Sequence, residues 1–148
     1  MYLCRTMKPK IEFRLLTHDE LLPLQNDFVL FLAAQGITKT DWTEIQAHNP
    51  ERYQALLIDF SNMVWHKILE GKECMEFVAN GHRYVIHYRE NETEMIRTSL
   101  QSPYEVARKV IARESEVKTA MFEALEAGAA FCQLSDFEAC KLLWQGTV

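Results

Sequence analysis

The sequence predicts an α+β fold in which helices flank a small antiparallel sheet. Helix-start signals recur along the N-terminal half and again beyond residue 100, whereas the segment between them alternates in polarity around an Asn-Gly pair. We therefore expect N-terminal helices, a three-stranded antiparallel meander over about residues 73–100, and C-terminal helices packed on one sheet face.

The N-terminal helices are predicted from their start signals. Thr17 and Glu20 have the spacing of a capping box, and Asn49 followed by Pro50 is typical of a helix start. Pro23 would clash with an upstream carbonyl inside a continuous helix. We therefore expect either a separate first turn or a kink there, and a long central helix from Pro50 to about residue 70.

The meander is predicted from two turns. Asn80-Gly81 favours a tight hairpin because both residues tolerate positive φ angles, and residues 91–93 supply a second turn. These turns predict the following cross-strand neighbours: Phe77 with Tyr84, Met75 with Ile86, Glu73 with Tyr88, then Tyr88 with Ile96, Ile86 with Thr98, and Tyr84 with Leu100. One face of the sheet is then apolar.

Two C-terminal helices are expected after the meander. Ser102 followed by Pro103 resembles a helix cap and first position, and predicts a long helix reaching about Ala127. Residues 127–130 are small and break this helix, and Leu134-Ser135-Asp136 starts a last one.

Composition limits the possible functions of the chain. A length of 148 residues fits one globular domain over residues 11–148, with a loose extension over residues 1–10. The net charge of −5 disfavours binding of nucleic acid over the whole surface. No apolar stretch is long enough to span a membrane, and the N-terminus lacks a secretion signal. We therefore expect a cytoplasmic protein with no membrane partner.

The cysteines give no metal-binding or disulfide pattern. The four cysteines are Cys4, Cys74, Cys132 and Cys140. None belongs to a CxxC pair, and none has a close histidine at zinc-finger spacing. We expect reduced thiols, no metal site and no cofactor.

The first half of the chain resembles a family of small uncharacterised bacterial proteins of the Bacteroidetes type. The resemblance covers residues 13–70 and rests on the segments Phe13-Arg-Leu-Leu-Thr17, Asp27-Phe-Val-Leu-Phe-Leu-Ala-Ala34, Gly36-Ile-Thr38 with Asp41-Trp42, Asn49-Pro-Glu51, and Asp59-Phe-Ser-Asn-Met-Val-Trp65. It implies a bacterial, cytoplasmic and non-catalytic protein, and it assigns no catalytic residue.

Two sets of residues on the polar sheet face are candidates for a functional site. The predicted register places Cys74, His87 and Arg97 in one cross-strand row, where a thiol with a lowered pKa would suit a nucleophile or a redox sensor. A half-buried cysteine beside an exposed histidine fits the same pattern.

The second set comprises Arg83, His87, Arg89 and Arg97, which together suit an anionic ligand or nucleic acid. The predicted aromatics lie on the opposite face, which disfavours base stacking. The sequence therefore leaves the function unknown and favours a non-enzymatic interaction or adaptor domain. Its binding partner would be another protein or a second copy of the chain.

Overall fold

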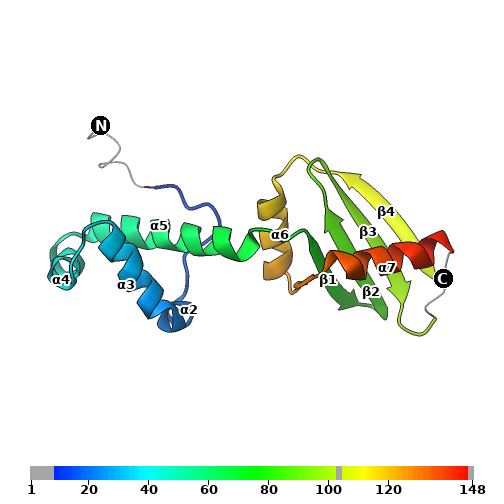
Figure 1. Cartoon of the computed structure of the whole chain (residues 1–148), viewed down its shortest axis with the longest axis horizontal. Helices are drawn as coiled ribbons and strands as arrows, with labels where there is room; N and C mark the ends of the chain where they lie inside the picture. Colours follow the sequence, from blue (N-terminus) through cyan, green and yellow to red (C-terminus); the bar gives the residue numbers. More distant parts are fainter. Residues whose placement is uncertain (1–8, 103–104, 147–148) are drawn as a thin grey trace. The chain divides into compact units, whose positions relative to one another are not determined.

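The computed structural model of the chain describes residues 9–102 and 105–146 (Figure 1). The chain divides into two compact units, Met1–Ile68 and Leu69–Val148. The first is helical, and the second contains a sheet with two helices, so the α+β class is confirmed. No helix among the described residues is long and apolar enough to cross a membrane. One domain over residues 11–148, with a loose extension before it, stays a prediction.

The first unit begins with the capping box predicted from the sequence. The Oγ1 of Thr17 accepts the N–H of Glu20 at 3.2 Å, and Oε1 of Glu20 accepts the N–H of Thr17 at 2.8 Å. The separate first turn at Pro23 is also confirmed, because a short 3-10 helix interrupts the α-helical path. The elements are α2 (His18–Leu21), η1 (Leu22–Leu24), α3 (Gln25–Ala34), α4 (Lys39–His48) and α5 (Pro50–Leu69).

The core of the first unit forms between α3, α4 and α5. Leu32, Ile37 and Leu56 are buried there, and the ring of Phe28 packs edge-on against Phe60 with their centroids 4.9 Å apart. The segment before α2 is held along α5 by hydrogen bonds that include three to Asn62 and Trp65. Asn62 accepts the N–H of Glu12 at 3.0 Å and donates to the carbonyl of Lys10 at 2.8 Å, and Trp65 donates to the carbonyl of Arg14 at 3.1 Å.

The second unit contains five antiparallel strands in the order β4-β3-β2-β1-β5, which corrects the expected three-stranded meander. Its elements are β1 (Cys74–Ala79), β2 (His82–Tyr88), β3 (Glu92–Ser99), β4 (Val106–Ala112), α6 (Val117–Glu126), β5 (Ala130–Cys132) and α7 (Leu134–Gln145). The two strands that the sequence analysis missed, β4 and β5, lie at opposite edges.

Strand β4 occupies the start of the long helix that the sequence predicted up to Ala127. Val106 and Val110 are four residues apart, a spacing that puts two side chains on one face of a helix and also of a strand. Pairing with β4 satisfies the outer backbone groups of β3, and β-branched residues suit that position. The helix α6 therefore begins only at Val117, and Pro103, the expected first helical position, lies outside the described residues.

The first hairpin forms as the sequence predicts. Asn80 and Gly81 both have positive φ angles, 53° and 75°. Phe77 then lies opposite Tyr84, and Met75 lies opposite Ile86. This register is confirmed because an Asn-Gly turn fixes the pairing of both strands.

The register expected for the second hairpin is wrong by three residues. Tyr88 lies opposite Thr93 instead of Ile96, and Tyr84 lies opposite Arg97 instead of Leu100. The turn closes earlier than expected, at Arg89, whose N–H donates to the carbonyl of Glu92 at 2.8 Å. A shift by an odd number of residues exchanges the two faces of a strand, so every β3 side chain lies on the face opposite to the expected one.

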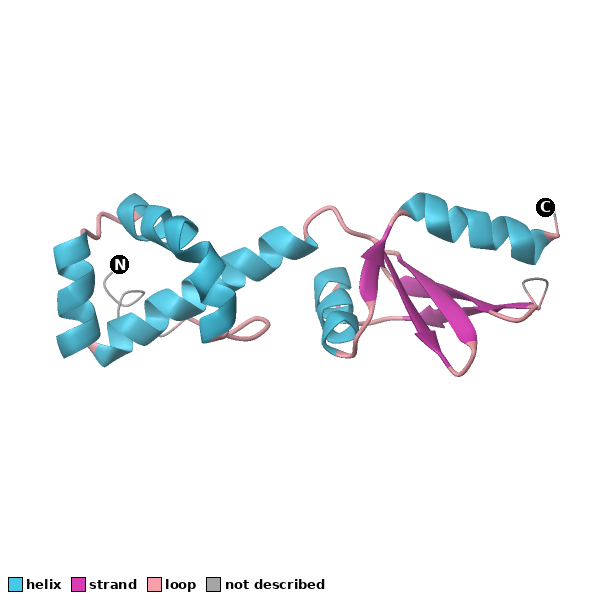
Figure 2. Ribbon diagram, turned by 90° about the horizontal axis from the view of Figure 1, so that it is seen from below, coloured by secondary structure: helices cyan, strands magenta, loops and turns pink. Residues whose placement is uncertain are grey.

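The two sheet faces have different cover (Figure 2). The helix α7 runs along one face, where its Phe137 and Cys140 pack against buried Cys74, Val85 and Ile96. We call this the covered face. The helix α6 lies away from α7, at the end of the sheet where β1 begins (Figures 1 and 2).

Candidate functional site

Of the predicted cross-strand row, the structure confirms the pairing of Cys74 with His87, and it places this pair on the covered face. Cys74 lies opposite His87 across β1 and β2, but the next residue in the row is Glu94 of β3, not Arg97. On its other side Cys74 lies opposite Cys132 of β5. The row therefore contains two thiols, an imidazole and a carboxylate.

The environment of Cys74 opposes an activated thiol. Its side chain is fully buried, and burial raises the pKa of the thiol to about 12, with smaller contributions from Cys132 and Glu73. His87 does not act as its base, because the Nε2 of His87 lies 2.8 Å from Oε1 of Glu73 and its ring packs against Phe137. This arrangement lacks the lowered pKa that a nucleophile or redox sensor requires.

The arginines of the covered face are paired with carboxylates. Arg83 donates from Nε and Nη2 to Oε1 of Glu76 at 3.0 and 2.9 Å. Arg89 contacts Glu92 at 3.0 Å and also contacts Glu94. An anion on this face would have to displace these contacts, so a ligand-binding role for the predicted set stays a prediction.

Glu94 is the buried centre of a charge network that the sequence analysis missed. Its carboxylate is fully buried and contacts Arg89, Arg108 and Lys141, the last at 3.3 Å. Burial alone would raise the pKa of Glu94, but its bonds to Arg108 and Lys141 outweigh burial and lower it. The network joins β3, β4 and α7, which indicates a structural role.

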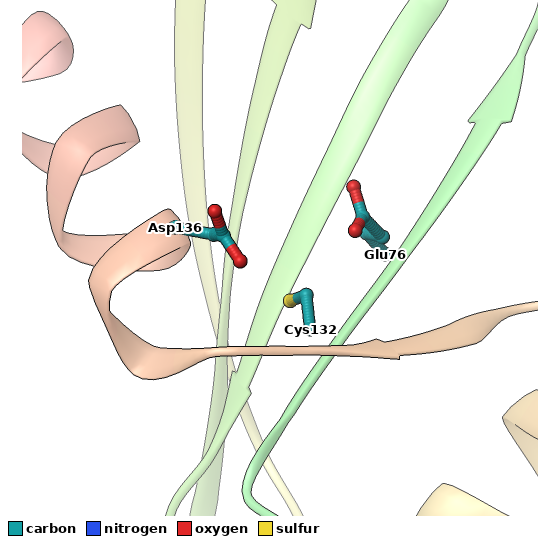
Figure 3. Close-up of side chains that lie close together, drawn as sticks. All are labelled: Glu76, Cys132 and Asp136. Carbon is teal, nitrogen blue, oxygen red and sulfur yellow. The ribbon is translucent and has the colours of Figure 1, made fainter.

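Three metal-ligating side chains also gather on the covered face (Figure 3). Glu76 of β1, Cys132 of β5 and Asp136 of α7 present donor atoms that all lie within 4.8 Å of one another. All three side chains are partly accessible. Burial raises the pKa of the Cys132 thiol to about 11, and Glu76 and Asp136 add to this effect. The sequence does not predict this grouping. Cys132 lies beside β1 only because β5 pairs with it, and β5 has only three residues, too few to be recognised as a strand.

The opposite sheet face carries cations beside aromatic rings. Phe77 and Tyr84 stack with their ring centroids 4.6 Å apart and their planes 8° apart, and His82 lies 6.4 Å from Tyr84. Arg97 follows Tyr84 in the same cross-strand row, and Lys109 lies on the next row. We call the surface formed by Phe77, His82, Tyr84, Arg97 and Lys109 the open face.

The open face differs from the covered face in its charge pairing. Arg97 and Lys109 are exposed, and neither side chain makes a hydrogen bond or ion pair with a residue that the structure describes. The stacked rings of Phe77 and Tyr84 are only partly buried. This combination was not predictable from the sequence, because the β3 register expected from the second turn places Arg97 on the other face.

Comparison with known proteins gives a family without an assigned activity. Residues 11–147 match the model of a family of unknown function, DUF6495. No curated protein matches the chain, and no solved structure matches it either.

Proposed function

The chain belongs to this family, and we propose that it is a non-enzymatic protein-interaction module that binds an acidic segment of a partner protein on its open face. The observation that carries the proposal is that Arg97 and Lys109 lie on the same sheet face as the stacked rings of Phe77 and Tyr84, with no ion pair to a described residue. Aromatic residues and arginine are the side chains most enriched at the energetic centres of interfaces.

The chemistry of the open face specifies what it would bind. The rings of Phe77 and Tyr84 offer an apolar surface, and the neighbouring cations suit carboxylates. A short extended segment that alternates acidic and apolar side chains would satisfy both, because alternate residues of an extended chain point to the same side. The proposal includes a cytoplasmic location, where thiols stay reduced.

Charge favours a protein segment over a nucleic acid. The whole chain carries a net charge of −5, which repels a long polyanion along its length. A short acidic segment needs only the two cations of the open face. Single-stranded nucleic acid, which would also stack on Phe77 and Tyr84, is therefore the competing occupant that the experiment has to exclude.

The test reverses both free cations of the open face. The variant R97E/K109E and the native full-length chain are titrated against a fluorescently labelled peptide of four Glu-Tyr repeats, which alternates carboxylates and rings, and against labelled oligo(dT). We expect the native chain to bind this peptide more tightly than oligo(dT). Two exposed charge contacts contribute up to about 1 kcal/mol each, so the reversal is expected to weaken binding roughly tenfold or more.

The matched control is R52E/K67E, which reverses two exposed cations of α5 and changes the net charge equally. This control is expected to retain binding. Equal losses in both double variants would attribute binding to net charge and contradict the proposal. Preference for oligo(dT), lost only in R97E/K109E, would assign the open face to nucleic acid instead.

A further inference from the structure

The group formed by Glu76, Cys132 and Asp136 has the composition of a zinc site. Its donor atoms come from β1, β5 and the first turn of α7, and they converge within 4.8 Å (Figure 3). Zinc accepts sulfur together with carboxylate oxygen, whereas magnesium and calcium prefer oxygen alone. A site with one thiol between two carboxylates therefore favours zinc.

Both carboxylates are positioned by the chain in a way that leaves one oxygen available. Arg83 donates twice to Oε1 of Glu76, and the N–H of Gln133 donates to Oδ2 of Asp136 at 2.9 Å. Oε2 of Glu76 and Oδ1 of Asp136 make no hydrogen bond with any described residue. Metal-ligating carboxylates are commonly oriented in this manner by hydrogen bonds to their other oxygen.

A second thiol lies beside the group and is separately unusual. Cys74 is 0% exposed, and its thiol makes no hydrogen bond within the described part of the chain. It lies opposite Cys132 in the β1–β5 register, so both side chains project from the covered face. Directly opposed side chains on neighbouring strands lie close enough to share a ligand. Cys74 is therefore a further sulfur donor beside Cys132, although its sulfur is not among the donor atoms that all lie within 4.8 Å of one another.

The local charge also suits a cation. Arg83 offsets only one of the two carboxylates, so the group is negative before any thiol ionises. The group is also reachable, because all three side chains are partly accessible. Cys132 in addition lines a depression of about 400 Å³, which neither Glu76 nor Asp136 lines. A divalent cation would neutralise this negative charge and displace the thiol protons.

We propose that Glu76, Cys132 and Asp136 bind one zinc ion, with Cys74 as the fourth ligand. Four protein ligands make a closed, structural type of site, which would tie the edge strand β5 and the start of α7 to β1. The strand β5 has only three residues and pairs with β1 alone, so such a link would stabilise this edge of the sheet. This proposal uses none of the residues of the open face.

The test is titration of the full-length, reduced and metal-free chain with zinc, followed by calorimetry. We expect one saturable site. The variants Cys132→Ser, Asp136→Asn and Cys74→Ser are each expected to lower the zinc affinity at least roughly tenfold. The amide oxygen that Asp136→Asn introduces can still accept the N–H of Gln133, so this variant keeps the helix cap. Glu114→Gln, an exposed residue between β4 and α6 and outside the group, is the control and should bind as the native chain does.

Two further measurements keep the proposal testable if a variant folds poorly. Zinc is expected to raise the Tm of the native chain and of Glu114→Gln, but not that of Asp136→Asn. Cadmium, which replaces zinc, is expected to give a sulfur-to-metal absorption band that Cys132→Ser weakens. Absence of saturable binding, or native affinity in both Cys132→Ser and Asp136→Asn, would overturn the site, and native affinity in Cys74→Ser would overturn the fourth ligand.

Discussion

Tyr84 lies directly opposite Arg97 across β2 and β3, and this pairing determines which sheet face carries the free cations. The sequence predicted Arg97 beside Cys74 and His87 on a polar face, which in the structure is the face that α7 covers. A register three residues away places it beside the Phe77–Tyr84 stack instead. The arginines that remain on the covered face are paired with carboxylates, so the two faces differ in the charge that they offer a ligand.

The stacked pair of Phe77 and Tyr84 is expected to contribute to stability beyond the area that each ring buries. The rings lie 4.6 Å apart and nearly parallel, and such pairs couple by about 0.5–1.5 kcal/mol. Urea unfolding of F77A, Y84A and the double variant measures this coupling as a double-mutant cycle. Additive effects, with no coupling above a few tenths of a kcal/mol, would contradict the stack.

The sequence predicted those features whose signals are local. The capping box of Thr17 and the hairpin at Asn80-Gly81 each depend on a few adjacent residues, and both are confirmed. The register of β1 and β2 follows directly from that turn. The pairing of strands far apart in the sequence was harder to predict. The spacing of Val106 and Val110 fits a helix and a strand equally, and the strand forms because it pairs with the outer edge of β3.

The candidate sites, too, were predictable only where a local turn fixes the register of the strands. Cys74 and His87 lie in one row because the first hairpin fixes them, whereas the position of Arg97 depended on the second turn, where no Asn-Gly pair specifies the register. The grouping of Glu76 with Cys132 depends on β5, whose three residues are too few to show any alternation.

Removal of the buried carboxylate of Glu94 is expected to be the most destabilising single change in the sheet. Glu94→Ala leaves Arg89, Arg108 and Lys141 without their common partner. Breaking a buried ion pair costs about 3–5 kcal/mol, and the partial exposure of the three cations places the expected loss at the lower end. Urea denaturation of the full-length chain measures it.

The control for Glu94 is Glu90→Ala, an exposed residue in the adjacent turn. Its effect on the free energy of unfolding is expected to stay within about 0.5 kcal/mol. If Glu94→Ala were no more destabilising than this control, the network would contribute nothing to the packing of α7 on the sheet.

The capping box at Thr17 is expected to make the first unit sensitive to acid in a defined range. The side-chain bonds from Arg14, then the backbone N–H of Thr17, lower the pKa of Glu20 from 4.5 to about 2. Because the folded pKa is the lower one, the stabilisation is complete above pH 4.5 and is lost as the pH falls toward 2. A chemical-shift titration of the Glu20 carboxyl carbon measures the pKa directly.

The Glu20→Gln variant serves as the comparison for this pH dependence. Glutamine can still accept the N–H of Thr17, but it carries no charge for Arg14 and does not titrate. The difference in unfolding free energy between native chain and variant should therefore shrink as the pH falls below 4.5. A constant difference across this range would show that Glu20 titrates normally.

Alkylation of Cys74 distinguishes the thiol-enzyme hypothesis from the binding functions proposed for the two faces. The side chain is fully buried and its pKa is raised to about 12, so the native chain is expected to resist iodoacetamide at pH 8. The same residue should react readily in urea, where burial is lost. Peptide mapping by mass spectrometry measures both extents of modification. Rapid modification of Cys74 in the native chain below pH 8 would require an accessible thiolate, as a nucleophile does. The packing of Cys74 against α7 opposes such a thiolate.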